Sequence, residues 1–126
     1  MAGEITINGS LTLRNTTTQQ TFSFSPGPTT ATQVATAACG GVQIVGTATE
    51  ALIVGDVTSA GWFTLRNLST AVSLELGTNT SSISILGILL PGEYAILPLG
   101  TTSVALRASS AAATNTVNVQ YMFHSR

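Results

Sequence analysis

A chain of 126 residues with 44% hydrophobic residues has room for one domain with a real core and too little for two of typical size. Only 7% of its residues are charged and none is a lysine, so the four arginines cannot form the basic patch that nucleic acids or anionic membranes require. Ser and Thr, 34 residues in all, supply the polar surface instead, and a surface so nearly uncharged favours assembly with other chains.

The first part of the chain predicts two strands. Apolar side chains share one parity of the first segment, namely Ile5, Ile7, Leu11 and Leu13. This alternation predicts one long half-buried strand with a bulge or close contact at Gly9. Asn8-Gly9 also suits a tight turn, so a short hairpin at this point is the alternative. After a polar turn, the alternating segment 21–25 carries two Phe and predicts a second strand, which ends at the Pro-Gly-Pro of 26–28.

The middle of the chain predicts short strands between Gly-, Asn- and Asp-containing turns. Segment 29–38 is rich in Ala and Thr, and its Thr content favours extended chain over the alternative of a helical turn. Alternating or apolar stretches then predict strands at 42–45, 52–54, 62–68 and 72–76.

Residues 83–90 are apolar on both parities beyond Ile85, as is typical of a strand covered on both faces. One of those faces is a candidate subunit contact, and a plain central core strand is the alternative. A turn at 90–93 follows, and Pro98 indicates that the strand at 94–99 ends at a sheet edge. Further strands are expected at 103–107 and 117–123, with a loop of small residues over 108–115 between them.

These roughly nine to ten short strands, with no convincing helix, predict an all-β fold. The expected architecture is a single domain over residues 1–126, a jelly-roll-like β-sandwich or barrel of about 8–10 short antiparallel strands. No strand–helix alternation is present, which excludes a doubly wound α/β sheet. The apolar stretch 83–99 is interrupted at 91–93 and predicts no membrane span, and the N-terminus carries no secretory signal, so synthesis in a cytoplasm is expected.

For each common type of catalytic or metal-binding site, the sequence lacks at least one of the required residues. Cys39 has no CxxC partner and no neighbouring His, so we interpret it as a free, inert thiol. His124 is the single histidine and lies close to the C-terminus, where we expect a surface residue rather than a general base. We therefore predict neither a metal nor a cofactor.

A pair of carboxylates for glycan hydrolysis is the remaining enzymatic hypothesis. The candidates are Glu50 with Asp56, or Glu75 with Glu93. Sugar clefts usually carry several aromatic platforms, and this chain has one Trp and two Tyr. We expect instead that Glu75 faces solvent opposite an arginine, that Glu93 lies in a turn, and that the protein is not an enzyme.

Trp62 and Arg66 share one face of the predicted strand at 62–68. Arg66 could form an ion pair with Glu75 on the next strand. The alternative is an arginine at a subunit or capsid interface, where Trp and Arg are enriched.

Several phrases of the sequence resemble small virion proteins of tailed bacteriophages. The matching phrases are GWxxxRNL at 61–68, VxLELG at 72–77 and LPGEY at 90–94, with EAL at 50–52, GDV at 55–57, an alanine-flanked Arg107, a closing VNVQY at 117–121 and an opening ITINGSL at 5–11. They cover most of the chain and are structural rather than catalytic phrases. The chain departs from the usual members by its scarcity of Lys, Asp and Glu, and no ligand residues carry over.

The resemblance implies a jelly-roll-like module that decorates or cements a capsid, often as a trimer. The expected function is that of a non-enzymatic virion structural protein, made in the bacterial host, which binds the major capsid protein as a homotrimer and binds neither nucleic acid nor membrane. The alternative is a tail, fibre or baseplate module that contacts host glycans. The expected interface residues come from the Trp62 region and the 83–90 strand, and are Trp62, Arg66, Ile83, Ile85, Leu86, Ile88 and Leu90.

Overall fold

The computed structural model describes residues 3–14, 16–33, 38–58, 61–99, 103–109 and 115–125. This part of the chain is all-β and has no helix, as the sequence predicted, but it has twelve strands rather than the expected 8–10. It therefore contains no helix long and apolar enough to cross a membrane. The chain divides into two compact units, Met1–Val34 and Ala35–Arg126, each with its own strand pairings. The single domain over residues 1–126 stays a prediction.

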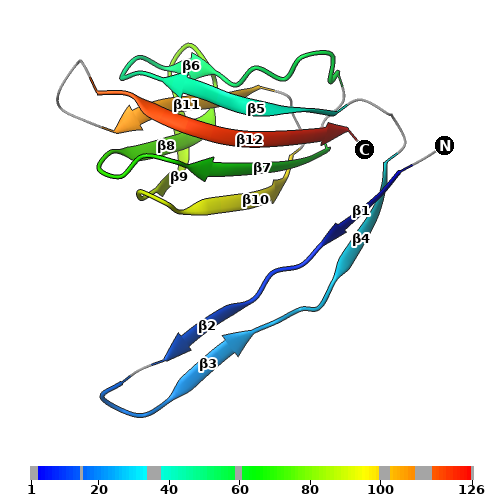
Figure 1. Ribbon diagram of the computed structural model, residues 1–126, viewed down its shortest axis with the longest axis vertical. Helices are drawn as coiled ribbons and strands as arrows, with labels where there is room; N and C mark the ends of the chain where they lie inside the picture. The colour runs from blue at the N-terminus through cyan, green and yellow to red at the C-terminus, as the bar shows by residue number, and fades with distance from the viewer. Residues whose placement is uncertain are drawn as a thin grey trace. The chain divides into compact units, whose positions relative to one another are not determined.

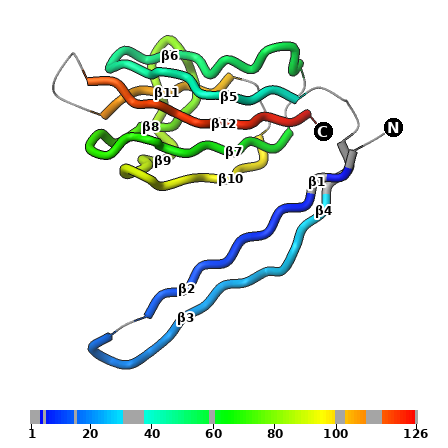
Figure 2. Tube along the Cα trace, in the orientation of Figure 1, coloured from blue at the N-terminus to red at the C-terminus, as the bar shows by residue number. Residues whose placement is uncertain are grey.

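The first unit is a long two-stranded β-hairpin, which we call the N-terminal hairpin (Figure 1). Its strands are β1 (Gly3–Ile7), β2 (Leu11–Arg14), β3 (Thr21–Phe24) and β4 (Thr29–Gln33). Antiparallel pairing joins β1 to β4 and β2 to β3, so the chain runs out through β1 and β2 and returns through β3 and β4 (Figure 2). Asn8-Gly9 lies within the outgoing side. The alternative of a tight turn at that dipeptide is therefore wrong.

An irregularity separates the two ladders of the hairpin. Ile7 pairs with Thr29 and Leu11 with Phe24, so the three residues 8–10 oppose the four residues 25–28. The longer side contains Pro-Gly-Pro, in which the prolines have no N–H to donate and Gly27 adopts a φ of +81°. The predicted end of the strand at this motif is confirmed, since β3 ends at Phe24 and β4 begins at Thr29. Residues 29–33 are extended, as predicted.

The second unit contains two four-stranded antiparallel sheets that pack together, which confirms the predicted β-sandwich. The strand order is β10-β7-β12-β5 in the first sheet, called the β7–β12 sheet, and β6-β11-β8-β9 in the second, called the β8–β11 sheet. The bounds are β5 (Ala38–Val45), β6 (Glu50–Ala51), β7 (Gly61–Asn67), β8 (Ser73–Thr78), β9 (Ser84–Leu89), β10 (Tyr94–Pro98), β11 (Val104–Ser109) and β12 (Val117–Ser125).

The core lies between the two sheets and follows the period-two alternation of their strands. Buried positions alternate with more exposed ones along β7 and along most of β12. Phe63 and Phe123 are opposite each other in the ladder, with ring centroids 6.2 Å apart and tilted planes, and both are fully buried. Leu74 and Leu106 cover them from the β8–β11 sheet as members of the same core cluster. Burying each such side chain contributes about 1.5–3 kcal/mol.

Two core-facing amide side chains tie the sheets to each other. Asn67, at the end of β7, is fully buried and donates from Nδ2 to the carbonyl oxygens of Val72 (2.9 Å) and Leu89 (3.0 Å), while its Oδ1 accepts from Ser69 N (2.9 Å). Gln43, on β5, donates from Nε2 to Ala51 O (2.9 Å) and accepts from Ile53 N at 3.0 Å. Each side-chain amide thus forms hydrogen bonds with backbone groups, in the way that the backbone of a neighbouring strand would. These bonds satisfy polar groups between the two sheets.

Several predicted boundaries differ from the observed strands. Residues 52–54 are not a strand; β6 covers Glu50–Ala51 instead, and Leu52 N then donates to Val104 O (2.9 Å). The predicted loop of small residues over 108–115 begins two residues later than expected, because β11 continues to Ser109. The edge position expected for Pro98 is confirmed, since β10 is an outer strand. Residues 34–37 and 110–114 of the predicted segments lie outside the described residues.

Replacing Asn67 tests the importance of these ties. We expect Asn67→Ala to lower the free energy of unfolding by about 3 kcal/mol, because three partly buried backbone groups lose their partner at about 1 kcal/mol each, the low end for an unsatisfied group. Urea unfolding followed by tryptophan fluorescence measures the change. Asn118→Ala, at an exposed position of β12, is the matched control and should change stability by less than about 0.5 kcal/mol. Equal effects of the two substitutions would contradict a structural role for the Asn67 amide.

Candidate binding surfaces

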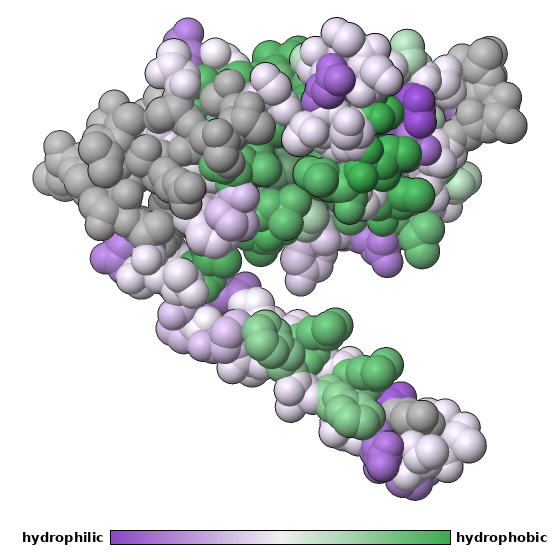
Figure 3. All heavy atoms as spheres, turned by 180° about the vertical axis from the view of Figure 1, so that it is seen from behind, coloured by the Kyte–Doolittle hydropathy of each residue, from purple (hydrophilic) through white to green (hydrophobic). Residues whose placement is uncertain are grey.

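The N-terminal hairpin carries exposed apolar side chains on one face. Leu11 pairs with Phe24 and Leu13 with Phe22, and paired residues of antiparallel strands point to the same side. We call these four residues the apolar stripe; each is between 59% and 69% exposed. Figure 3 shows apolar side chains in green along this unit. The expected half-buried strand is therefore wrong for residues 11–14, whose side chains are exposed on both faces.

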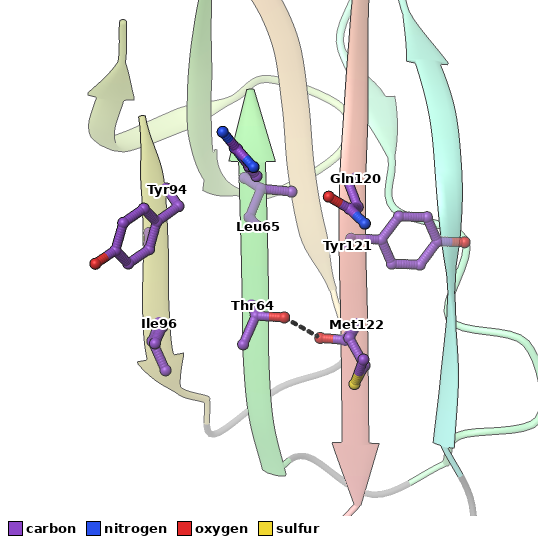
Figure 4. Close-up of a pocket in the computed structure, with 9 residues that line it drawn as sticks. Thr64, Leu65, Tyr94, Ile96, Gln120, Tyr121 and Met122 are labelled. Carbon is purple, nitrogen blue, oxygen red and sulfur yellow. Dashed lines mark hydrogen bonds between the residues drawn. The ribbon is translucent and has the colours of Figure 1, made fainter. Parts of the chain in front are cut away.

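A shallow groove of about 180 Å³ lies on the outer face of the β7–β12 sheet (Figure 4). Two cross-strand rows form its floor and walls: Tyr94, Arg66 and Gln120, then Ile96, Thr64 and Met122. The hydroxyl of Thr64 donates to Met122 O at 3.5 Å. Its described lining is mainly apolar and includes one exposed tyrosine ring, one guanidinium and one amide but no carboxylate.

Trp62 and Arg66, both expected at an interface, lie on this outer face. Arg66 is exposed and makes no ion pair within the described part of the chain. Trp62 is half-buried and lies between Pro98 and His124 in the next row. His124 is also half-buried, and its Nδ1 is buried without a hydrogen-bond partner among the described residues. His124 thus lies on the outer face of the sheet, within β12, while the next residue, Ser125, points to the other face and is fully buried.

The other expected interface residues lie on or beside β9, at the edge of the β8–β11 sheet. Ile83 precedes β9 and is half-buried, while the remaining four are between 48% and 64% exposed: Ile85, Leu86, Ile88 and Leu90. The hypothesis of a strand covered on both faces is therefore wrong for a single copy of the chain, as is its alternative of a central core strand. The seven expected residues form two groups on different sheets.

A β-bulge explains why the 83–90 segment is apolar on both parities. Leu76 pairs with Gly87 and Gly77 with Ile85, so Leu86 is an extra residue without an opposite partner. The shift places Ile85 and Ile88 on the same side of the sheet, because they oppose Gly77 and Glu75, which are two residues apart. Gly77 is required at this point, since a Cβ there would lie 2.3 Å from Ser84 O.

Glu75 is paired with Arg107 and not with Arg66. Arg107 Nε and Nη2 donate to Glu75 Oε2 at 2.6 and 2.5 Å across neighbouring strands β11 and β8. The alternative of an Arg66–Glu75 pair is wrong because β7 and β8 belong to different sheets, although they follow each other in sequence. Glu75 does lie opposite an arginine, as expected, but it is only 9% exposed and does not face solvent.

The remaining carboxylates of the hydrolase hypothesis mostly have structural partners. Glu50 Oε1 accepts from Gly46 N at 2.7 Å. Glu93 lies in the predicted turn, where its Oε2 accepts from Leu90 N at 2.8 Å and Gly92 adopts a φ of +83°. Asp56 is exposed in another turn. Among the described residues, no three His, Cys, Asp or Glu side chains are grouped closely enough to hold a metal ion.

Cys39 is half-buried at the start of β5. Its thiol donates to Ile53 O at 3.8 Å, and burial raises its pKa above the ordinary value. The pKa of Tyr121 is also raised, first by burial and second by the neighbouring Cys39. A thiol with a raised pKa is a weak nucleophile near neutral pH, which agrees with the interpretation of Cys39 as inert.

The sequence did not predict the apolar stripe as a binding surface. Alternation of Leu11 with Leu13 and of Phe22 with Phe24 is the same in a half-buried strand and in a hairpin that exposes both faces. Only the strand pairing distinguishes the two. One signal in the sequence could have indicated a separate hairpin. Both alternating segments lie between two breaks, at Gly9 and at Pro26-Gly27-Pro28.

Comparison with known proteins finds no family model that matches the chain and no curated protein with significant similarity to it.

The reactivity of Cys39 is a direct check on its environment. Because burial raises the pKa of the thiol, the thiolate fraction at pH 8.5 is smaller in the folded protein than in the unfolded chain. We expect alkylation by iodoacetamide at pH 8.5 to be slower in buffer than in 8 M urea. Rates measured by mass spectrometry that were equal in the two states would contradict the burial of this side chain.

Proposed function

We propose that this chain is a non-enzymatic structural protein of a virion, which decorates or cements the capsid of a tailed bacteriophage as a homo-oligomer bound to the major capsid protein. The resemblance of the GWxxxRNL, VxLELG and LPGEY phrases to such virion proteins supports the proposal. So does the scarcity of charge, because a nearly uncharged Ser- and Thr-rich surface is best tolerated where much of it is covered by other chains.

The apolar stripe is the observation that carries the proposal. The sandwich has a complete core of its own, yet Leu and Phe side chains remain exposed together on the N-terminal hairpin. A two-stranded hairpin is at best marginally stable in water unless its apolar face is covered. Contiguous exposed apolar surface of this kind marks a protein–protein contact. The edge strand β9, with four exposed apolar residues on or beside it, is a second surface of the same character.

The partners of the carboxylates support a non-enzymatic role. Glu50, Glu75 and Glu93 each accept a hydrogen bond that holds a turn or a strand pair. A glycosidase needs one carboxylic acid with a raised pKa and a second carboxylate across a substrate cleft. Side chains already engaged within the fold are poor candidates for either task.

The second candidate function is a tail, fibre or baseplate module that contacts host glycans. The groove on the β7–β12 sheet favours it, because an exposed Tyr94 in one cross-strand row with Arg66 and Gln120 offers stacking and hydrogen bonding to a sugar. A single exposed aromatic ring is little for a glycan site, so the capsid role is preferred.

Co-sedimentation with purified phage parts tests the proposal. We expect the full-length protein to sediment with mature heads of the phage that encodes it, at a fixed ratio to the major capsid protein, and not with tails purified from the same phage. Heads from an unrelated phage are the control for non-specific adsorption. Binding to tails alone would overturn the capsid role in favour of the second candidate, and binding to neither part would overturn both.

A further inference from the structure

The dipeptide Asn8-Gly9 is a sequence motif that the proposed function does not use. It lies in the segment 8–10 of the N-terminal hairpin, between β1 and β2 (Figure 2). The residues of this segment are exposed and belong to neither ladder of the hairpin. On the opposite side of the hairpin, Pro26 and Pro28 have no N–H to donate to it. The segment is therefore held by strand pairing only at its two ends.

The surroundings of Gly9 leave its backbone nitrogen accessible. No heavy atom outside its chain neighbours lies within 4 Å of the position that a Cβ would take. Among the described residues, neither Gly9 N nor the Asn8 side chain has a hydrogen-bond partner. Glycine also permits wide backbone rotation, so the Asn8 side chain can approach the Gly9 nitrogen without displacing a packed group.

We propose that Asn8 is a modification site, at which the chain converts its own asparagine into aspartate and isoaspartate. The Gly9 nitrogen loses its proton to solvent and attacks Cγ of Asn8, which forms an N–Cγ bond. The bond between Cγ and Nδ2 breaks, and Nδ2 takes a proton from solvent and leaves as ammonia. The product is a succinimide ring that joins the side chain of Asn8 to the main chain.

Water completes the reaction by opening the ring at one of its two carbonyl carbons. Addition of water to Cγ breaks the bond between Cγ and the Gly9 nitrogen and gives aspartate. Addition to the main-chain carbonyl carbon of residue 8 breaks the peptide bond instead and gives isoaspartate, in which the main chain runs through Cγ. Both products carry a new carboxylate, and neither step changes an oxidation state.

The other asparagines of the chain are less suited to this reaction. Asn67 is buried, and the nitrogen that would attack its Cγ, Leu68 N, donates to Asn118 O at 2.9 Å. A β-branched residue crowds the attacking nitrogen at each remaining asparagine, since Thr or Val follows. These positions are Asn15, Asn79, Asn115 and Asn118. Conversion is therefore expected first at Asn8.

The modification changes the charge of the N-terminal hairpin. Glu4 and Arg14 are the charged residues of segment 3–33. Arg14 lies six residues beyond Asn8, about 20 Å along an extended chain, so it does not pair with the new carboxylate. Each converted copy thus carries one more uncompensated negative charge. This inference goes beyond the proposed function and does not depend on attachment to a capsid.

Peptide mapping of the full-length protein tests the proposal. The protein is incubated at about pH 8.5 and digested with trypsin, which cleaves after arginine and releases Asn8 in peptide 1–14. Compared with a sample that was not incubated, this peptide should gain the mass difference between an amide and an acid before any other peptide does. It should also elute as two products, aspartate and isoaspartate. A single aspartate product would exclude the ring, and no conversion would refute the proposal.

Gly9→Ala is the matched control variant. The open space around Gly9 accommodates a Cβ, and its φ is not positive, so the variant should keep the circular dichroism of the wild type. The added methyl group crowds the attacking nitrogen, so the mass-shifted peptide 1–14 should be lost over the period in which the wild type converts. Conversion of this variant at the wild-type rate would contradict attack by the Gly9 nitrogen.

The same incubation in 8 M urea separates the contribution of the fold from that of the dipeptide. We expect Asn8 to convert at similar rates in buffer and in urea, because strand pairing does not hold segment 8–10 in the folded chain. Asn67, in peptide 67–107, should stay unmodified in buffer because it is buried. Conversion of Asn8 in urea alone would mean that the fold protects it, contrary to the proposal.

Discussion

An apolar face of a β-sheet must be covered by a second layer, and the two units of this chain meet that requirement differently. In the sandwich the β7–β12 and β8–β11 sheets cover each other, so Phe63, Phe123 and the Leu and Val residues around them are removed from water within one molecule. The N-terminal hairpin has one layer only, and its Leu and Phe rows remain exposed in a single copy. The need for a second layer over this hairpin supports the proposed assembly function.

The sandwich needs more than apolar contact to hold its sheets in register. Asn67 and Gln43 replace backbone hydrogen bonds between strands that belong to different sheets. A buried amide is favourable only when all of its groups are paired, so these two side chains specify one relative position of the strands that they join. The two sheets are thereby held in one register, which suits the proposed role of holding other subunits in place.

Strand existence was largely predictable from the sequence, because period-two alternation and Gly- or Pro-containing turns are local signals. The positions of β7, β8, β10 and β12 agree closely with the segments expected from those signals. What the sequence did not reveal depends on pairing between distant segments. The ion pair of Glu75 with Arg107, the bulge at Leu86 and the exposure of the stripe all follow from which strand lies beside which. The expected interface residues on β9 were chosen because the segment is apolar on both parities. In the structure this segment is an edge strand with a bulge, and not a strand covered on both faces.

Hydrogen–deuterium exchange of the β2–β3 amides tests the central claim most directly, namely that copies of this chain cover the stripe of the N-terminal hairpin. If copies of the chain cover the stripe, these amides should exchange slowly at high protein concentration and rapidly on dilution, while the amides of β7 remain protected at both. Fast exchange of β2 and β3 at every concentration, in a sample that is still oligomeric, would contradict the account.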